Sequence, residues 1–290
     1  MKKIISLALV AVMLLVSLFT FASCAEDTII VQTNAFFAPF EYYDGDKIVG
    51  VDVEIMSKVG EKLGKKIQFD NVSFSAIIDN VKDGKVCDAG AAGITITDSR
   101  KEKVDFSTPY YTSVQYVIIP TNSTLATKKG ADNSEYMVWE ALAGKNIGVQ
   151  MDTTGYIYTD GEINATAADE NYGYDGVLYG TNTTCTPFST AQLAADAITA
   201  NQIDAVIIDE LPAQFIVSKN SNFKCVPLYY SGATDAEDAP VMEQYAICVT
   251  KGNTELLNAI NGVLEELMVK DENGVTAIEK MVMKHMGMDQ

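Results

Sequence analysis

The chain has 290 residues, in which 39 acidic residues stand against 21 basic ones, so the formal net charge is −18. This acidity argues against a nucleic-acid partner, because phosphate binding needs a positive field. About 265 residues follow the leader segment described next, more than the ~100 to 200 of a usual single core, so we expect two lobes.

Residues 1–23 read as an export signal, with lysines near the start, then an apolar stretch and small residues before Cys24. The ending FASC resembles a bacterial lipobox, with Phe21 where lipoboxes usually have Leu. We therefore expect a lipid on Cys24, which would hold the protein outside the cytoplasm, anchored to the cell membrane. Ordinary signal cleavage near Ala25 is the alternative. No second apolar run approaches the ~20 residues that a membrane-spanning helix needs.

From Thr28 onward, short β-branched runs alternate with longer amphipathic stretches. This alternation predicts an α/β fold with mostly parallel sheets. Two stretches, AIIDNVKDGKVCDAG and QLAADAITANQIDAV, both run from a helix through a polar turn to a strand that opens with Asp-Ala, as expected of two related lobes. The expected strands are KIQFDNVS, CDAGAAG, NIGVQ, IDAVIID and FKCVPLYY, and the expected helices cover residues 51–63, 75–83, 135–143, 189–201 and 210–219.

The boundary between the lobes is expected in SVQYVIIPTNSTLATKKGADNS, which passes from a strand into a polar loop. Lobe 1 then comprises residues 24–117 and 246–290, and lobe 2 comprises residues 118–245.

Two later segments complete the expected organisation. Residues 159–184 have little periodicity and are expected to form a surface excursion of lobe 2. The strand YAICVTK should cross back to lobe 1 and lead into the helix NTELLNAINGVLEELM, with Asn253 or Thr254 as its N-cap.

Arg100 is the only arginine in the chain, which otherwise uses lysine for positive charge. A planar guanidinium can give two parallel hydrogen bonds to a carboxylate, which an ammonium group cannot. Arg100 ends the run AGITITDSR, which offers backbone N–H groups and hydroxyls at a turn from strand to helix, and such a turn can hold an anion. We expect a carboxylate-binding site here. A surface arginine is the alternative.

The cysteines and the lone histidine do not suggest a metal site. Cys87, Cys185, Cys225 and Cys248 allow three disulfide pairings, and the sequence does not choose among them. Cys87 and Cys248 lie in apolar strand-like runs, where we expect buried free thiols. His285 lies near the C-terminus, without the spacing of a Cys/His metal site.

At this point the chain resembles the extracytoplasmic solute-binding proteins of ABC transporters for polar amino acids, close to the glutamine, histidine and lysine/arginine/ornithine binders of family 3. The resemblance implies a periplasmic-binding-protein-like fold, with two α/β sandwich lobes joined by two hinge strands, that closes over one amino acid. The matching segments occur in the family order and cover nearly all of the mature chain, and AGITITDSRKEKVDFSTPYY is the most specific. The others are TNAFFAPFEYYDGDKIVGVDVEI, VSFSAII, GKNIGVQMDTT, IDAVIIDELPA and YAICVTKGNTELLNAINGVLEEL.

The resemblance implies roles for residues around the ligand's α-carbon. Arg100 would hold the α-carboxylate, helped by the hydroxyl and backbone N–H of Thr95, and the Gly93 carbonyl would face the amino group. Asp209 would take the α-ammonium from lobe 2. Thr153 and Thr154 would bind the second carboxylate oxygen across the cleft.

For three of these residues, helix capping is the alternative to ligand binding. Asp209, Thr153 and Thr154 each stand where a helix is expected to begin, so each could act as a helix cap.

The same resemblance implies how the ligand side chain is held. Phe37 and Phe74 match positions that enclose the aliphatic stem, although plain core packing is the alternative for both. Asn34 and Gln150 match positions that read the side chain, where some relatives carry charged residues. Because a buried charge without a partner costs several kcal/mol, two neutral amides favour a neutral polar ligand such as glutamine over a basic amino acid.

The resemblance therefore implies a monomeric binding module without metal or cofactor. It would trap an extracellular amino acid by hinge closure and deliver it to an ABC transporter permease. The alternatives on the same fold are an enzyme like cyclohexadienyl dehydratase and an amino-acid sensor. No nucleophile, metal cluster or paired carboxylate in the sequence favours an enzyme.

Overall fold

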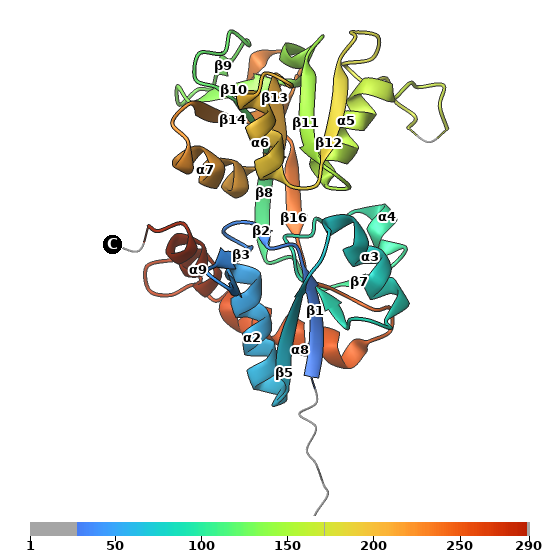
Figure 1. The fold of residues 1–290 in the computed structure, drawn as a ribbon, viewed down its shortest axis with the longest axis vertical. Coiled ribbons are helices and arrows are strands. Elements are labelled where there is room, and N and C mark those ends of the chain that lie inside the picture. The colour runs from blue at the N-terminus through green and yellow to red at the C-terminus, as the bar shows by residue number, and fades with distance from the viewer. Residues whose placement is uncertain (1–27, 171, 289–290) are drawn as a thin grey trace, which may run out of the picture.

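The structure, a computed structural model, describes residues 28–170 and 172–288. The expected export signal and Cys24 lie outside the described residues. Figure 1 shows two lobes, one above the other, joined by β8 (Tyr111–Pro120) and β16 (Met242–Tyr245). No helix in the described ranges is long and apolar enough to cross a membrane.

The first lobe is built on a five-stranded mixed sheet flanked by helices. β1 runs parallel to β5 and β6, whereas β17 runs antiparallel to β6 and β7. A small hairpin sheet, β2-β3-β4, lies beside it. The main strands, in sheet order, are β5 (Lys66–Asn71), β1 (Thr28–Thr33), β6 (Ala89–Gly90), β17 (Cys248–Val249) and β7 (Asp105–Phe106), and the hairpin consists of β2 (Phe36–Phe37), β3 (Glu41–Asp44) and β4 (Lys47–Val49). The helices are α2 (Val51–Leu63), α3 (Phe74–Asp83), α4 (Asp98–Lys101), α8 (Thr254–Leu267) and α9 (Ala277–His285).

The second lobe has a larger mixed sheet in which β11 runs parallel to β12 and β13, while β8 runs antiparallel to β13 and β14. Its order is β12 (Thr184–Phe188), β11 (Asn146–Gln150), β13 (Ala205–Asp209), β8, β14 (Phe223–Tyr230), β10 (Glu135–Val138) and β9 (Lys128–Lys129), with β15 (Ala239–Pro240) on β14. The other elements are the helices α5 (Thr154–Asn164), α6 (Ala191–Thr199) and α7 (Glu210–Lys219) and the 3-10 helices η1 (Trp139–Leu142) and η2 (Asp235–Glu237).

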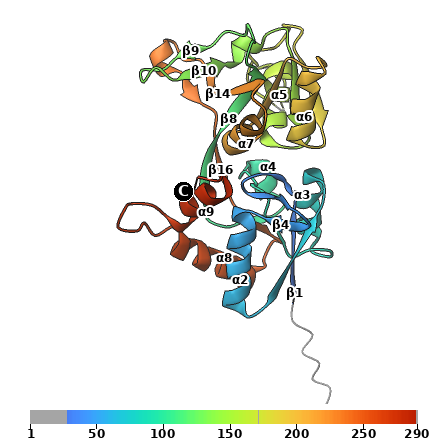
Figure 2. The same cartoon turned by 60° about the vertical axis from the view of Figure 1, so that its left-hand side comes forward.

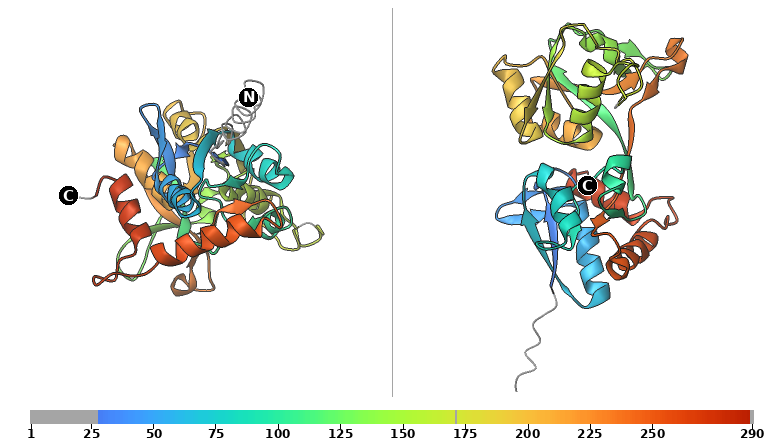
Figure 3. Two further views of the ribbon diagram at one scale, coloured as in Figure 1. Left: turned by 90° about the horizontal axis from the view of Figure 1, so that it is seen from below. Right: turned by 90° about the vertical axis from the view of Figure 1, so that its right-hand side faces the viewer.

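The two connecting strands pair with each other where they pass between the lobes. β16 runs antiparallel to the first half of β8, from Tyr245 opposite Tyr111 to Met242 opposite Val114. They keep this place after rotation in Figure 2, and the right-hand view of Figure 3 shows them along one edge of the molecule. The left-hand view of Figure 3, from below, shows α2 (blue) beside α8 (orange), and these two helices pack together.

The structure is an α/β two-lobed fold, as predicted. Residues 51–63, 146–150, 210–219 and 223–230 form the expected elements with the expected bounds. The prediction of mostly parallel sheets is wrong, because each main sheet combines parallel and antiparallel strands. The lobe boundaries at residues 117 and 245 stay a prediction.

The helix predicted over residues 135–143 is also wrong. Its first half is β10, in which Met137 lies opposite Leu228 of β14, and the rings of Tyr136 and Tyr229 are 4.5 Å apart. Sheet pairing here outweighs the local helix preference of the sequence.

The excursion predicted for residues 159–184 is only partly right. α5 continues to Asn164, and the side chains of Thr159 and Leu178 are buried. The described residues between 165 and 183 are irregular but anchored to the lobe, for example by the Leu178 N–H, which donates to the Glu162 carbonyl over 2.9 Å.

The core lies on both sides of each sheet. α2 illustrates why its sequence forms a helix: acidic residues occupy the first turn, Lys62 the last, and Gly64 ends it in the left-handed conformation with φ 66°. Its fully buried Ile55 and Val59 face the sheet one turn apart. Such packing leaves the strand ends facing the other lobe free to carry polar side chains.

Candidate functional site

All ten residues singled out in the sequence line one pocket between the lobes. Most of them stand at or just after the carboxyl ends of strands, the usual place for a ligand site in α/β sheets. The first lobe supplies Asn34, Phe37, Phe74, Gly93, Thr95 and Arg100, and the second supplies Gln150, Thr153, Thr154 and Asp209.

Arg100 is held rigidly in α4 at one side of the pocket. Its guanidinium is buried, with Nη1 donating to the Thr95 carbonyl over 2.8 Å and Nη2 donating to the Asp152 carbonyl of the second lobe over 2.9 Å. The Phe74 ring covers it at 5.4 Å, a cation–π contact. Burial lowers the pKa of Arg100, and the nearby Glu243 carboxylate opposes that effect. This is a fixed, partly desolvated cation suited to a carboxylate.

Gly93 shapes the wall next to Arg100. It has φ +53°, and a Cβ there would come within 2.6 Å of the Phe37 ring, so a side chain would be strained and crowded. Its N–H donates to Asp52 Oδ2 over 2.9 Å, and Tyr110 donates its hydroxyl to Asp52 Oδ1 over 2.5 Å.

The sequence analysis missed Asp52 and Tyr110, which support this turn from behind. Burial raises the pKa of Asp52 to about 6, against the effect of its two hydrogen bonds. The sequence did contain an indication that Asp52 is buried. It shares the apolar face of the predicted helix with Ile55, Met56 and Val59, where a carboxyl group needs a specific partner.

Asp209 enters the pocket from the second lobe. It occupies the N-cap position of α7, but its side chain makes no capping hydrogen bond, so the capping alternative is not realised. Instead its carboxylate accepts from Gln115 Nε2 over 3.0 Å. Burial, followed by repulsion from Glu243, raises the pKa of Asp209 well above its usual range. The positive charge of a ligand ammonium would lower the pKa of Asp209 against both effects.

The threonines at the start of α5 combine structural and pocket-facing positions. Thr153 caps the helix by accepting from the Tyr156 N–H over 3.4 Å and donates to the Gln150 carbonyl over 2.8 Å. The capping alternative therefore holds for Thr153. The Thr154 hydroxyl lies 3.4 Å from that of Thr95, so this pair joins the two lobes.

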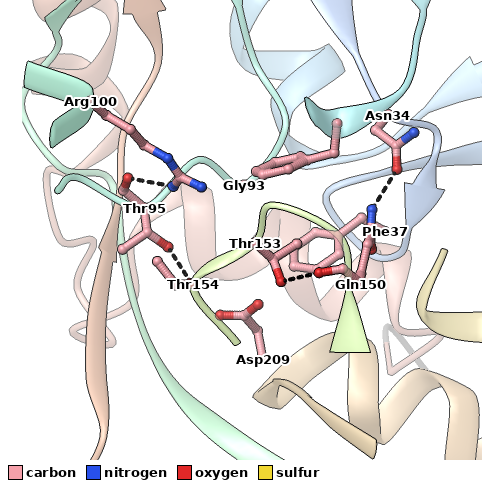
Figure 4. A pocket seen from close by; sticks show the side chains of 10 residues that line it. Asn34, Phe37, Gly93, Thr95, Arg100, Gln150, Thr153, Thr154 and Asp209 are labelled. Carbon is pink, nitrogen blue, oxygen red and sulfur yellow. Dashed lines mark hydrogen bonds between the residues drawn. The ribbon is translucent and has the colours of Figure 1, made fainter. Parts of the chain in front are cut away.

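A pair of amides closes the opposite side of the pocket, as Figure 4 shows. Gln150 Nε2 donates to Asn34 Oδ1 over 3.0 Å, and Asn34 Nδ2 donates to the Val72 carbonyl over 2.7 Å. Gln150 Oε1 is buried and accepts no hydrogen bond from the described residues. It is therefore an acceptor available to a donor on a ligand side chain.

Two buried acidic residues near the pocket were also missed by the sequence analysis. Glu41 is fully buried, with neither carboxyl oxygen bonded within the described part of the chain. It lies opposite Phe37 in the hairpin, which places both side chains on the same face. Burial, then the charges of Asp52 and Asp209, raises its pKa well above the usual range. Glu243 in β16 accepts from the Thr95 hydroxyl over 3.0 Å.

The four cysteines that the structure describes are all free thiols. Cys87 and Cys248 are buried free thiols, and Cys185 and Cys225 are half-buried and free. Among the residues that the structure describes, no group of three His, Cys, Asp or Glu side chains is placed to hold a metal ion.

Comparison with known proteins gives consistent relatives. Residues 29–278 match the model of the bacterial extracellular solute-binding proteins, family 3. The arginine-binding extracellular protein ArtP of Bacillus subtilis is 27% identical over 88% of this chain and 85% of its own. An ancestral arginine-binding protein bound to glutamine has a TM-score of 0.68 and 30% identity, covering 90% of this chain and 98% of its own. Holo ArgBP from T. maritima has a TM-score of 0.65 and 31% identity, covering 87% and 95%.

Proposed function

The chain belongs to the bacterial extracellular solute-binding proteins of family 3, and from that membership we propose that its lobes close over one amino acid and deliver it to an ABC transporter permease. The observation that carries the proposal is the pairing of a buried cation from one lobe with a buried carboxylate from the other. Arg100 and Asp209 line the same pocket, in which an α-carboxylate and an α-ammonium would find opposite charges. Every amino acid carries both groups, so Arg100 and Asp209 would recognise amino acids in general, whatever their side chain.

The side chain of the ligand would lie toward the amide pair. In Figure 4, Arg100 and Thr95 lie on one side of the pocket, and Asn34 and Gln150 on the other. Two amides can donate and accept, which supports glutamine as the ligand. The ancestral relative with 30% identity, whose structure holds glutamine, supports the same choice.

A specific observation favours a basic amino acid as the second candidate. Glu41 is a buried carboxyl group without a hydrogen-bond partner in the described residues, on the same face as Phe37. A guanidinium or ammonium on the ligand side chain would offset the cost of burying it. The relatives ArtP and ArgBP are named for arginine.

A melting screen distinguishes these candidates. A ligand at one hundred times its Kd stabilises the fold by about 2.7 kcal/mol, which is a clear melting shift. We expect the largest shift with glutamine. A larger shift with arginine than with its neutral analogue citrulline, abolished by Glu41→Gln, would support the basic ligand instead. No shift with any amino acid would contradict the proposed function.

Delivery, lack of catalysis and anchoring need separate tests. Uptake of the labelled amino acid by cells should require this chain, whereas a sensor would leave uptake unchanged. The amino acid should be recovered chemically unaltered after incubation, whereas a dehydratase-like enzyme would convert its substrate.

Cys24→Ala should release the protein from the membrane fraction, and an unmutated protein that already fractionates as soluble would contradict the lipid anchor. Sedimentation should show a monomer.

A further inference from the structure

We infer that Glu243, in the connecting strand β16, is a positioning residue that makes the Thr95 hydroxyl an acceptor for the ligand's ammonium group. This inference rests on the proposed function, because it concerns how the same pocket tells an amino acid from a carboxylic acid without an amino group. Glu243 does not line the pocket and would act through Thr95, which does.

The direction of one hydrogen bond carries the argument. Thr95 donates its hydroxyl to Glu243 Oε2 over 3.0 Å. A hydroxyl has one hydrogen to donate, so the Thr95 oxygen can then only accept. In its 3.4 Å contact with Thr154, the donor is therefore Thr154. An acceptor oxygen attracts an ammonium and repels a carboxylate. The α-carboxylate would therefore bond the backbone N–H of Thr95 and not its hydroxyl, although the sequence analysis expected both.

The charges around this hydroxyl fit the same conclusion. Glu243 is 3% exposed and Asp209 is 4% exposed, and both carboxyl groups lie close enough to affect Arg100. The Glu243 charge also raises the pKa of Asp209, after the larger effect of burial. Two buried carboxyl groups thus lie near one guanidinium, and a ligand ammonium next to Asp209 and Thr95 would reduce the repulsion between them.

The connecting strand keeps this arrangement in place on the side of the first lobe. Thr95 forms a bridge with Tyr245, and the backbone on either side is bonded to the same strand region, with Ile96 N–H donating to the Gln244 carbonyl over 2.9 Å. The segment that carries Thr95 and the strand that carries Glu243 are therefore held together by backbone hydrogen bonds. The Thr95 hydroxyl would therefore be oriented before the lobes close and bring Asp209 to the ligand. This lowers the cost of ordering the site when the ligand binds.

The test compares amino acids with their deamino analogues by titration calorimetry. The probes are glutamine with glutaramate, and arginine with 5-guanidinopentanoate. Glu243→Met removes the acceptor and the charge, and Glu243→Gln keeps the shape should the first variant fold poorly. We expect Glu243→Met to weaken binding of the amino acid about tenfold and of the deamino analogue less than about twofold, because only the amino acid uses the oriented hydroxyl. Glu243→Gln should show a smaller loss of the same selectivity.

Two controls separate positioning from general destabilisation. Glu162→Gln alters an equally buried glutamate, 4% exposed, which accepts from the Val177 N–H away from the pocket, and should leave both affinities unchanged. In a Thr95→Val background, Glu243→Met should cost no further affinity. Equal losses for amino acid and analogue, or no loss at all, would overturn the inference while the proposed function stands. If the unmutated protein binds no amino acid, the proposed function fails and the inference fails with it.

Discussion

At the scale of single residues, the pocket depends on one guanidinium whose geometry is already fixed. Arg100 donates to carbonyls in both lobes and is covered by Phe74, so a flexible ammonium could not take its place. We predict that Arg100→Lys weakens amino-acid binding by about 2 to 5 kcal/mol, at least tenfold in Kd, although the charge is unchanged. Titration calorimetry measures this, with Lys101→Arg on the exposed side of the same helix as control. Equal dissociation constants for Arg100→Lys and the parent would contradict it.

Asp52 leads to a prediction about pH. Its pKa is about 6 in the folded protein and about 3.9 in an unfolded chain, so the folded state binds more protons in this window. The contribution of Asp52 to the free energy of unfolding therefore falls as pH rises from about 4 to 6, by about 2 to 3 kcal/mol in total.

Asp52→Asn removes this titration. Relative to the variant, the parent should lose about 2 kcal/mol of unfolding free energy between pH 4 and pH 7. Urea denaturation of both proteins at the two pH values measures the difference, in which the titration of groups that do not interact with Asp52 cancels. A parallel pH dependence for the two proteins would show that Asp52 does not titrate there.

The sequence identified the residues at the pocket surface but not those behind it. Arg100 was found because it is unique and stands in a recognisable motif, whereas Glu41, Asp52 and Glu243 lie inside a hairpin, a helix and a connecting strand. Their role depends on burial and on distant partners such as Thr95, 148 residues away from Glu243. Local patterns carry no such information.

At the scale of elements, the echo between two stretches of sequence corresponds to a repeated structural unit. Asp88 accepts from the Ile30 N–H over 2.8 Å at the start of β6, and Asp204 accepts from the Asn146 N–H over 2.8 Å at the start of β13. In both places the aspartate N–H also donates to the carbonyl of that same partner residue. The expectation of two similar helix–turn–strand units is thereby confirmed.

This repeat predicts a stability cost in each lobe, larger in the first lobe. Asp88→Ala should lower the free energy of unfolding by about 1 to 3 kcal/mol, because a part-buried backbone N–H loses a charged acceptor, whereas Asp204→Ala should cost less, because its hydrogen bond is exposed. Asp79→Ala is the control, since it removes only an exposed ion pair with Lys103 and should cost less than about 1 kcal/mol. Chemical denaturation measures all three. A cost for Asp88→Ala no larger than that of the control would contradict the structural role.

Elements whose identity depends on distant pairing were the ones predicted wrongly. The stretch EYMVWEALA has a sequence compatible with a helix, yet its first half becomes β10 because β14 provides a partner strand. By contrast α2 was placed correctly, since its apolar spacing and the glycine that ends it, Gly64, are local signals. Local signals therefore predicted most helices, whereas the sheet edges required the tertiary structure.

At the scale of the whole molecule, the lobes meet directly across the pocket. Arg100 bonds Asp152, Thr95 contacts Thr154, and Gln150 bonds Asn34, so several contacts of the closed form involve the residues that would hold the ligand. A ligand that replaces these contacts with stronger ones shifts the equilibrium toward closure.

Asp209 belongs to the second lobe, so its contribution should appear only on closing. Asp209→Asn should weaken amino-acid binding and leave more of the saturated protein open, because the ammonium loses its charged partner. Small-angle scattering with and without the amino acid measures the compaction. Compaction at saturation identical to the parent would contradict this role.

The most direct test of the account is a crystal structure grown with the amino acid that gives the largest melting shift. The account predicts one molecule between the lobes, with its α-carboxylate bonded to Arg100, its α-ammonium beside Asp209 and Thr95, and its side chain directed toward Asn34 and Gln150. An amino acid bound elsewhere, or bound in this pocket with its carboxylate away from Arg100, would contradict it.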